Sequence, residues 1–270
     1  MARRVWSRRR SGRRTGHHGR ASLAGGALIV ALAATGCAGG SDTPDGSATT
    51  TSTGQPTQEA TTDPPLTDLD GCLTAADATL VRVDGALTKS DVAILGDGPT
   101  GVIISYENHG TVCPWLPLAD RLVAAGHTVV LYDRRVGDAS DYPIDLTTFL
   151  RDRGIEDVTL LGGSLGGMAS VQAATTIDPP VEAVVALSGA DASTVAYGPA
   201  LRVPLLQVVE QADSGFAQAV PELDRAAVNS PDHQLMLLNG DAHASAIFDT
   251  TDSAAVMDRI VAFVDTYAGS

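Results

Sequence analysis

The fold of this 270-residue chain is decided by the stretch Leu160-Leu161-Gly162-Gly163-Ser164-Leu165-Gly166-Gly167-Met168. It contains the pattern Gly-x-Ser-x-Gly with Ser164 at its centre. Residues 158–161 form a short apolar run typical of a buried strand, and the Ala-rich residues 168–176 favour a helix. A serine on such a tight strand-to-helix turn has a strained backbone and an exposed hydroxyl, and the flanking glycines are needed because side chains there would meet the neighbouring strand or helix. The stretch therefore predicts a serine nucleophile, the alternative being a glycine-rich turn that contains a serine by chance.

Apolar runs and helical patterns alternate on both sides of this turn. Strands are predicted at residues 102–105, 129–132, 158–161, 183–187, 205–209 and 235–238, and helices at 116–125, 145–153, 216–228 and 254–267. Two further runs, 79–83 and 91–95, flank a polar turn and are typical of a hairpin. Continuous apolar strands that alternate with helices predict an α/β fold with a mostly parallel central sheet and helices on both faces.

The first 36 residues have the pattern of a secretory signal peptide. Eight of the 18 basic residues lie within the first 20, and an apolar stretch at 23–35 ends at Gly36-Cys37. This stretch is short for a membrane-spanning helix, which makes an uncleaved anchor the alternative. Ala34-Thr35-Gly36-Cys37 resembles a bacterial lipobox, with alanine where leucine is usual, and this resemblance implies a lipidated Cys37. The arginine cluster lacks the apolar residues that follow a twin-arginine pair.

Three regions follow from this organisation: a lipoprotein-type signal peptide at 1–36, a tether at 37–66 and a folded domain at 67–270. The tether is rich in Ser, Thr, Pro and Gly and has too few apolar side chains to fold. Beyond residue 36, ten basic residues remain against 32 acidic ones, a net charge of −22 that disfavours binding to nucleic acid. We expect an exported protein, held at the extracytoplasmic face of the cell membrane by its lipid anchor, or a cell-surface protein.

Cys72 and Cys113 remain as an even pair in an exported chain, which predicts one disulfide bond. It would tie the start of the folded domain to a loop beside the active site. The alternative is two free buried thiols.

A serine nucleophile needs a histidine base and a carboxylate that orients it. His243 lies in a polar turn after the last apolar strand, where α/β folds place their chemistry. Asp213 follows the strand at 205–209 and is the predicted acid, and Asp191, one strand earlier, is its rival. Two other histidines, His127 and His233, precede strands and are interpreted as surface residues.

The chain resembles the α/β-hydrolase family over roughly residues 79–267. The resemblance rests on the Ser-turn, the order Ser164, Asp213, His243, the segment Trp115-Leu116-Pro117-Leu118-Ala119-Asp120-Arg121-Leu122, and Asp133-Arg134-Arg135-Val136-Gly137-Asp138. The last segment is similar to the family loop Asp-x-Arg-Gly-x-Gly, with Val136 in place of a glycine. The resemblance implies a hydrolase with a Ser-His-acid triad that acts on esters or related acyl compounds without metal or cofactor.

Two backbone N–H groups should form the oxyanion hole of such an enzyme. The resemblance implies Leu165 as one donor, and Asn108 as the other, with Glu107 as second choice. The family's His-Gly pair would fall on Tyr106-Glu107, whereas the visible His109-Gly110 lies three residues later. His109 is therefore either a solvated loop residue or a substrate contact.

Residues 188–202 leave room for no large cap domain, so we expect an open, shallow site that suits a small or polymer-attached acyl substrate. The predicted function is an exported, membrane-tethered, carboxylesterase-like serine hydrolase. Thioesterases, peptidases and acyltransferases use the same parts, and the alternative of another class is a non-catalytic surface lipoprotein that uses the fold for binding. The sequence pattern leaves the oligomeric state open.

Overall fold

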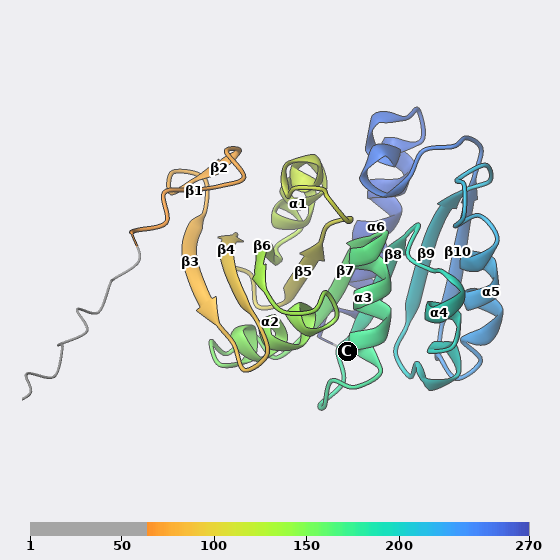
Figure 1. The fold of residues 1–270 in the computed structure, drawn as a ribbon, viewed down its shortest axis with the longest axis horizontal. Helices are drawn as coiled ribbons and strands as arrows, with labels where there is room; N and C mark the ends of the chain where they lie inside the picture. The colour runs from red at the N-terminus through yellow and green to blue at the C-terminus, as the bar shows by residue number, and fades with distance from the viewer. Residues whose placement is uncertain (1–63, 270) are drawn as a thin grey trace, which may run out of the picture. The chain divides into compact units, whose positions relative to one another are not determined.

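The computed structural model describes residues 64–269 (Figure 1). The predicted signal peptide, the lipidation site Cys37 and nearly all of the predicted tether lie outside these residues. In the described part of the chain, no helix is long and apolar enough to cross a membrane.

An eight-stranded sheet forms the centre of the fold, in the order β10-β9-β8-β7-β5-β6-β4-β3 (Figure 1). Its strands are β3 (Thr79–Asp84), β4 (Lys89–Leu95), β5 (Gly101–Ser105), β6 (Thr128–Val136), β7 (Val158–Gly163), β8 (Ala183–Leu187), β9 (Leu205–Glu210) and β10 (His233–Leu238). The neighbouring strands from β10 to β6 are parallel, whereas β4 pairs antiparallel with both β6 and β3, so β4 runs opposite to the other seven strands of this sheet. The structure thus confirms the mostly parallel sheet and the hairpin of β3 and β4. A short separate ladder joins β1 (Asp68–Leu69) to β2 (Leu73–Thr74).

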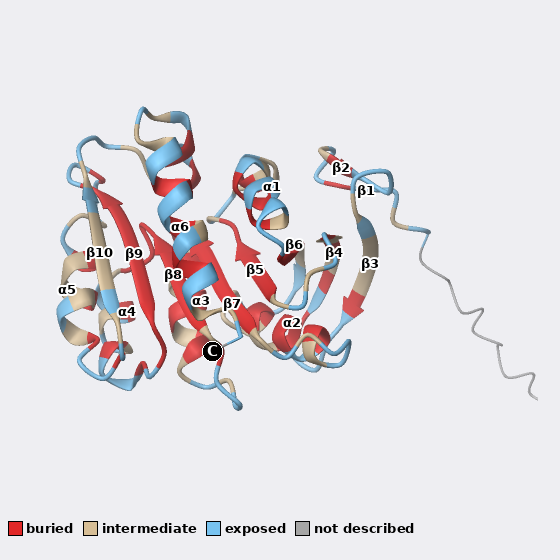
Figure 2. Cartoon of the chain, turned by 180° about the vertical axis from the view of Figure 1, so that it is seen from behind, coloured by how far each residue is buried: buried red, intermediate tan, exposed pale blue. Residues whose placement is uncertain are grey.

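Helices cover both faces of this sheet, as predicted. The helices are α1 (Leu116–Ala124), α2 (Asp141–Arg151), α3 (Leu165–Ala174), α4 (Ala192–Val195), α5 (Ala219–Ala226) and α6 (Ser253–Tyr267), with 3-10 turns at Cys113–Trp115, Gly198–Ala200 and Ala244–Asp249. The buried side chains of α1 and α6 belong to one hydrophobic core, and those of α2, α3 and α5 to a second core on the opposite face. Every residue of β5, β7, β8 and β9 is buried between these layers, whereas the edge strands β3 and β10 are partly exposed (Figure 2).

Two helix predictions were wrong at their ends. Helix α2 begins at Asp141 rather than at residue 145, because Pro143 falls in the first turn, where its missing N–H costs no hydrogen bond. Helix α5 begins only at Ala219. The N–H groups of Phe216 and Ala217 bond to the Asp213 carbonyl instead and close a turn before the helix.

The prediction that His127 is a surface residue was also wrong. Its side chain is 5% exposed, and Nε2 lies 2.9 Å from Oδ1 of Asp265 on α6. Its Nδ1 is within hydrogen-bond distance of the Thr100 hydroxyl. Helix α6 covers the start of β6, which the local sequence around His127 does not indicate. His233, by contrast, is exposed as predicted.

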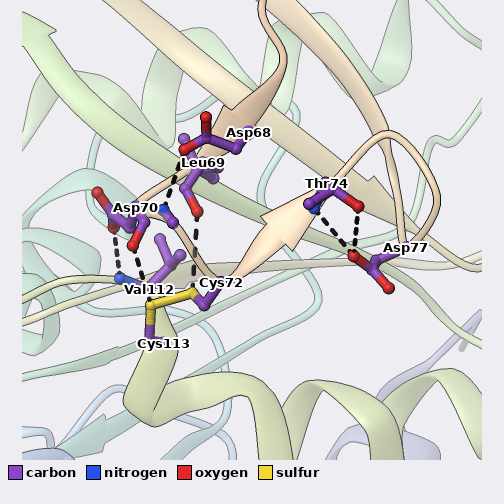
Figure 3. The surroundings of a disulfide bond; sticks show 9 residues. Asp68, Leu69, Asp70, Cys72, Thr74, Asp77, Val112 and Cys113 are labelled. Atoms are coloured by element: carbon purple, nitrogen blue, oxygen red, sulfur yellow. Dashed lines mark hydrogen bonds between the residues drawn. A yellow bond between two sulfur atoms is a disulfide. The ribbon is translucent and has the colours of Figure 1, made fainter.

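The predicted disulfide joins Cys72 to Cys113 (Figure 3). Beside it, the Val112 N–H donates a 2.8 Å hydrogen bond to a carboxylate oxygen of Asp70. The two contacts tie the segment between β1 and β2 to the chain just before α1. They therefore brace the start of α1 from outside the sheet.

Candidate active site

Ser164 lies on the turn between β7 and α3 in a strained backbone, with φ 50° and ψ −120°. A left-handed φ is costly for a residue other than glycine and is typically found at functional sites. The flanking glycines permit this turn. A Cβ on Gly162 would lie 2.5 Å from the Gly166 backbone, and a Cβ on Gly166 would lie 2.0 Å from the Ser105 carbonyl oxygen. The turn thus packs directly against the end of β5, as the motif predicts.

His243 and Asp213 are brought together from the chain beyond β10 and β9. Nδ1 of the imidazole lies 3.1 Å from both carboxylate oxygens, and Asp213 is only 3% exposed. The Phe216 ring packs on the imidazole with 4.5 Å between the ring centroids. Because Asp213 engages Nδ1, the imidazole has Nε2 left to accept a proton from another group.

Ser164 comes close to this pair through its chain neighbours. A Cβ on Gly163 would lie 2.8 Å from Cβ of Ala244, so the residue before the serine contacts the residue after His243. Within residues 64–269, the serine hydroxyl makes no hydrogen bond to a protein group, while its N–H donates to the Leu187 carbonyl. Catalytic hydrogen bonds are often long before substrate binds, so this geometry is compatible with a nucleophile that pairs with His243 during the reaction.

Asp191, the rival acid, has a different role in the structure. It is the N-cap of α4, and its Oδ1 accepts hydrogen bonds from the N–H groups and hydroxyls of Ser193 and Thr194. These donors, the Ser193 hydroxyl first, lower the pKa of Asp191. Of these two carboxylates, Asp213 is the one that pairs with His243.

Three acceptors that sequence reasoning missed hold the chain around His243. The Ala242 N–H donates to Oε2 of Glu210 at 2.6 Å, and the Ala244 N–H donates to the Ser188 hydroxyl at 3.1 Å. The Ser245 hydroxyl donates to Oε1 of Glu107. Glu210 and Ser188 lie where β9 and β8 end, and both are at most 1% exposed. A charged residue at the end of an apolar strand was a sequence signal for Glu210, whereas nothing local singled out Ser188.

The loop after β5 carries the second expected oxyanion donor, and Arg134 holds it. The guanidinium donates from Nη1 to the Tyr106 carbonyl at 3.2 Å and from Nη2 to the Glu107 carbonyl at 2.9 Å. It also lies 4.0 Å above the centre of the Tyr106 ring. In a trans peptide the C=O and N–H groups point in opposite directions, so the N–H groups of Glu107 and Asn108 point away from Arg134.

These N–H groups are available to a ligand. Neither of them donates a hydrogen bond within the described residues. Leu165 is the first residue of α3, so its N–H has no partner inside the helix. The structure therefore places three free donors on the two segments named by the sequence, Leu165 on one and Glu107 with Asn108 on the other. His109 is exposed, with φ 58°.

The segment after β8 carries only the short helix α4 and a 3-10 turn before β9 begins. No group of three or more His, Cys, Asp or Glu side chains in the described part of the chain is arranged to hold a metal ion.

Known structures resemble this one over most of their length. Dienelactone hydrolase from Anabaena variabilis superposes with a TM-score of 0.63 at 16% identity and covers 71% of this chain and 98% of its own. An esterase from Pyrococcus furiosus gives 0.61 at 13% identity, with 71% and 94% covered. Mouse alpha/beta hydrolase domain-containing protein 10 gives 0.55 at 16% identity, with 70% and 99% covered. No family model and no curated protein sequence matches the chain. At these identities the resemblance is one of fold.

Proposed function

We propose that this chain, which has the α/β-hydrolase fold, is a serine hydrolase that cleaves a carboxylic ester. The observation that carries the proposal is the strained Ser164 turn beside the bonded pair of His243 and Asp213. A strained serine costs free energy and persists where the surrounding structure holds it. Here the Ser164 N–H is bonded to the Leu187 carbonyl, and buried Glu210 holds the segment that carries the histidine.

In the proposed mechanism, the Ser164 hydroxyl attacks the ester carbonyl carbon while His243 Nε2 takes its proton. Asp213 stabilises the imidazolium that forms. The N–H groups of Leu165 and of Asn108 or Glu107 bind the oxyanion. When the intermediate collapses, the bond from the carbonyl carbon to the alcohol oxygen breaks, and the alcohol leaves with the proton from His243. Water then attacks the acyl-serine in the same way and releases the acid.

The ester class is favoured by the neighbours in fold, which include a dienelactone hydrolase and an esterase. The same catalytic groups could also cleave thioesters and activated amides. The short segment after β8 favours a small or polymer-attached substrate over a long lipid chain, because no larger cap encloses the site in the described residues.

We also propose export and tethering at the extracytoplasmic face of the membrane. The support is the signal-like pattern of residues 1–36, Cys37 in its lipobox-like context, and the disulfide of Cys72 with Cys113. Disulfides persist mainly in oxidising compartments. Metabolic labelling with a fatty acid, compared between the parent and Cys37→Ala, tests the lipid anchor.

The test of the activity is hydrolysis of p-nitrophenyl acetate by the full-length chain and its Ser164→Ala variant, with a fluorophosphonate probe and mass spectrometry of the labelled peptide. We expect turnover and labelling at Ser164 in the parent and neither in the variant. A folded parent that shows no turnover and no labelling would reject the hydrolase and favour a binding protein with this fold.

A further inference from the structure

A cavity of about 280 Å³ lies directly beside the expected oxyanion donor. From α3, the cavity is lined by Leu165, Met168 and Gln172. The segment after β8 contributes Asp191 and Tyr197, and the loop before α2 contributes Ser140. The three α3 residues are spaced as i, i+3 and i+7, so they share one face of the helix. Because Leu165 follows Ser164, the cavity borders the residue next to the proposed nucleophile.

The cavity changes character along α3. The first turns of the helix contribute the apolar side chains of Leu165 and Met168. Gln172 lies seven residues after Leu165, which corresponds to about 10 Å along a helix. A substrate group that extends along this face of α3 therefore meets the Gln172 amide about 10 Å beyond Leu165.

Several polar groups of the lining make no side-chain hydrogen bond in the described part of the chain. Within residues 64–269, the Gln172 amide, the Tyr197 hydroxyl and the Ser140 hydroxyl make no side-chain hydrogen bond, although each residue is only partly exposed. Asp191 uses Oδ1 for the N-terminus of α4. The hydrogen bond from the Ser193 hydroxyl and those from Thr194 favour its charged form and lower its pKa.

This lining selects against two kinds of ligand. An alkyl chain would remove the free amide and hydroxyls from water without replacing their hydrogen bonds, at a cost of about 1–3 kcal/mol for each group. An anionic group would meet the carboxylate of Asp191 at close range. An uncharged group with several hydroxyls can satisfy the same side chains. At about 30 Å³ for each water molecule, the volume holds roughly nine waters, comparable to one sugar ring.

We propose that this cavity binds an uncharged, hydroxyl-rich unit, a sugar or polyol, as the alcohol portion of the ester. Such a compound forms esters through one of its own hydroxyls, so it enters as the leaving group. Its ester oxygen departs from the acyl carbon and takes a proton from His243. This inference rests on the proposed function, and it assigns Gln172 and Tyr197 as the residues that determine specificity.

Three acetate esters test it on the full-length chain: methyl 6-O-acetyl-glucoside, cyclohexylmethyl acetate of matched size, and an acetylated gluconate as the anion. We expect kcat/KM to be highest for the glucoside. Gln172→Leu and Tyr197→Phe should each lower it about tenfold, the scale of one neutral hydrogen bond, and should lower kcat/KM for p-nitrophenyl acetate less, because the nitrophenyl leaving group has no hydroxyls for these side chains to bind. Gln218→Leu, at the start of α5 and outside the cavity, is the matched control and should change neither substrate.

A preference for the cyclohexyl ester, or an unchanged glucoside-to-nitrophenyl ratio in both variants, would overturn the assignment while hydrolysis through Ser164 stands. A readout without catalysis separates the two proposals. Saturation-transfer NMR should detect methyl glucoside on Ser164→Ala and lose the signal when Tyr197→Phe is added. Absence of that signal in Ser164→Ala counts against the cavity whether or not the parent is active.

Discussion

Replacing Arg134 by methionine should slow the chemical step and leave substrate binding almost unchanged. Methionine keeps part of the apolar contact with the Tyr106 ring and removes both hydrogen bonds to the loop carbonyls. The peptides of Glu107 and Asn108 are then free to rotate, and their N–H groups lose the orientation needed to meet an oxyanion. Because an oxyanion forms only in the transition state, the loss should appear in kcat rather than in KM.

The magnitude follows from the contacts that remain. A hydrogen bond from a charged donor contributes about 1.5–3 kcal/mol, and loss of one oxyanion donor costs about 100- to 1000-fold in kcat. Two other contacts still hold the loop, because the Glu107 carboxylate accepts from the Trp115 indole at 2.9 Å and from the Ser245 hydroxyl. Water also reaches the half-buried Arg134. We therefore expect a loss of about 10- to 100-fold in kcat, or about 1.4–2.7 kcal/mol in the barrier.

The assay is steady-state hydrolysis of p-nitrophenyl acetate together with inhibition by a boronic acid, which mimics the tetrahedral intermediate. Inhibitor affinity should fall in parallel with kcat. Arg134→Lys should be intermediate, because one ammonium group does not match the fork of a guanidinium. Arg135→Met is the matched control, since Arg135 pairs with Asp91 on β4, and it should stay within about twofold. The reasoning is refuted if Arg134→Met keeps kcat and inhibitor affinity, or if KM alone rises.

Three further outcomes are expected. Asp213→Asn should lower kcat by about 10³- to 10⁴-fold at unchanged thermal stability, because the imidazole loses its orienting carboxylate. The control Asp252→Asn, at the start of α6, should leave kcat unchanged, and equal losses in the two variants would remove Asp213 from the triad. Glu210→Ala should lower kcat about tenfold, and Glu210→Gln should retain most of the activity, since Gln keeps an acceptor oxygen for the Ala242 N–H. Equal kcat values for the two variants would show that this hydrogen bond does not position His243. Cys113→Ser should lower the free energy of unfolding by about 4 kcal/mol, because the disulfide no longer restricts the unfolded chain across the 41-residue separation. The Tm should fall by about 10 °C while kcat at low temperature stays the same, and an unchanged Tm in calorimetry would contradict this explanation.

Much of the fold could be predicted because it depends on local patterns. The apolar runs are continuous where strands are buried on both faces, and the structure has β5, β7, β8 and β9 fully buried at those positions. The hairpin of β3 and β4 followed from two apolar runs that flank a polar turn. Errors came where a distant element changes the environment, as when α6 buries His127.

Part of the candidate site could likewise be predicted from the sequence, and part could not. Chain order placed Ser164, Asp213 and His243 after three different strands, β7, β9 and β10, and parallel strands bring such ends to one edge of the sheet. The sequence pattern left Asp191 and Asp213 open, and only the structure pairs one of them with the imidazole. The choice depends on the path of each loop in space, which has no local pattern.

By itself, the sequence determined the strand-turn-helix at Ser164, the parallel sheet and the cysteine pair, since each follows from neighbouring residues or composition. Only the tertiary structure decided what holds the reactive segments. Hydrogen bonds join Ala244 to Ser188, Ala242 to Glu210 and Arg134 to Glu107, which are 56, 32 and 27 residues apart in the sequence. The physical reason is that these hydrogen bonds join the ends of different strands, so they exist only once packing has fixed the order and register of the sheet.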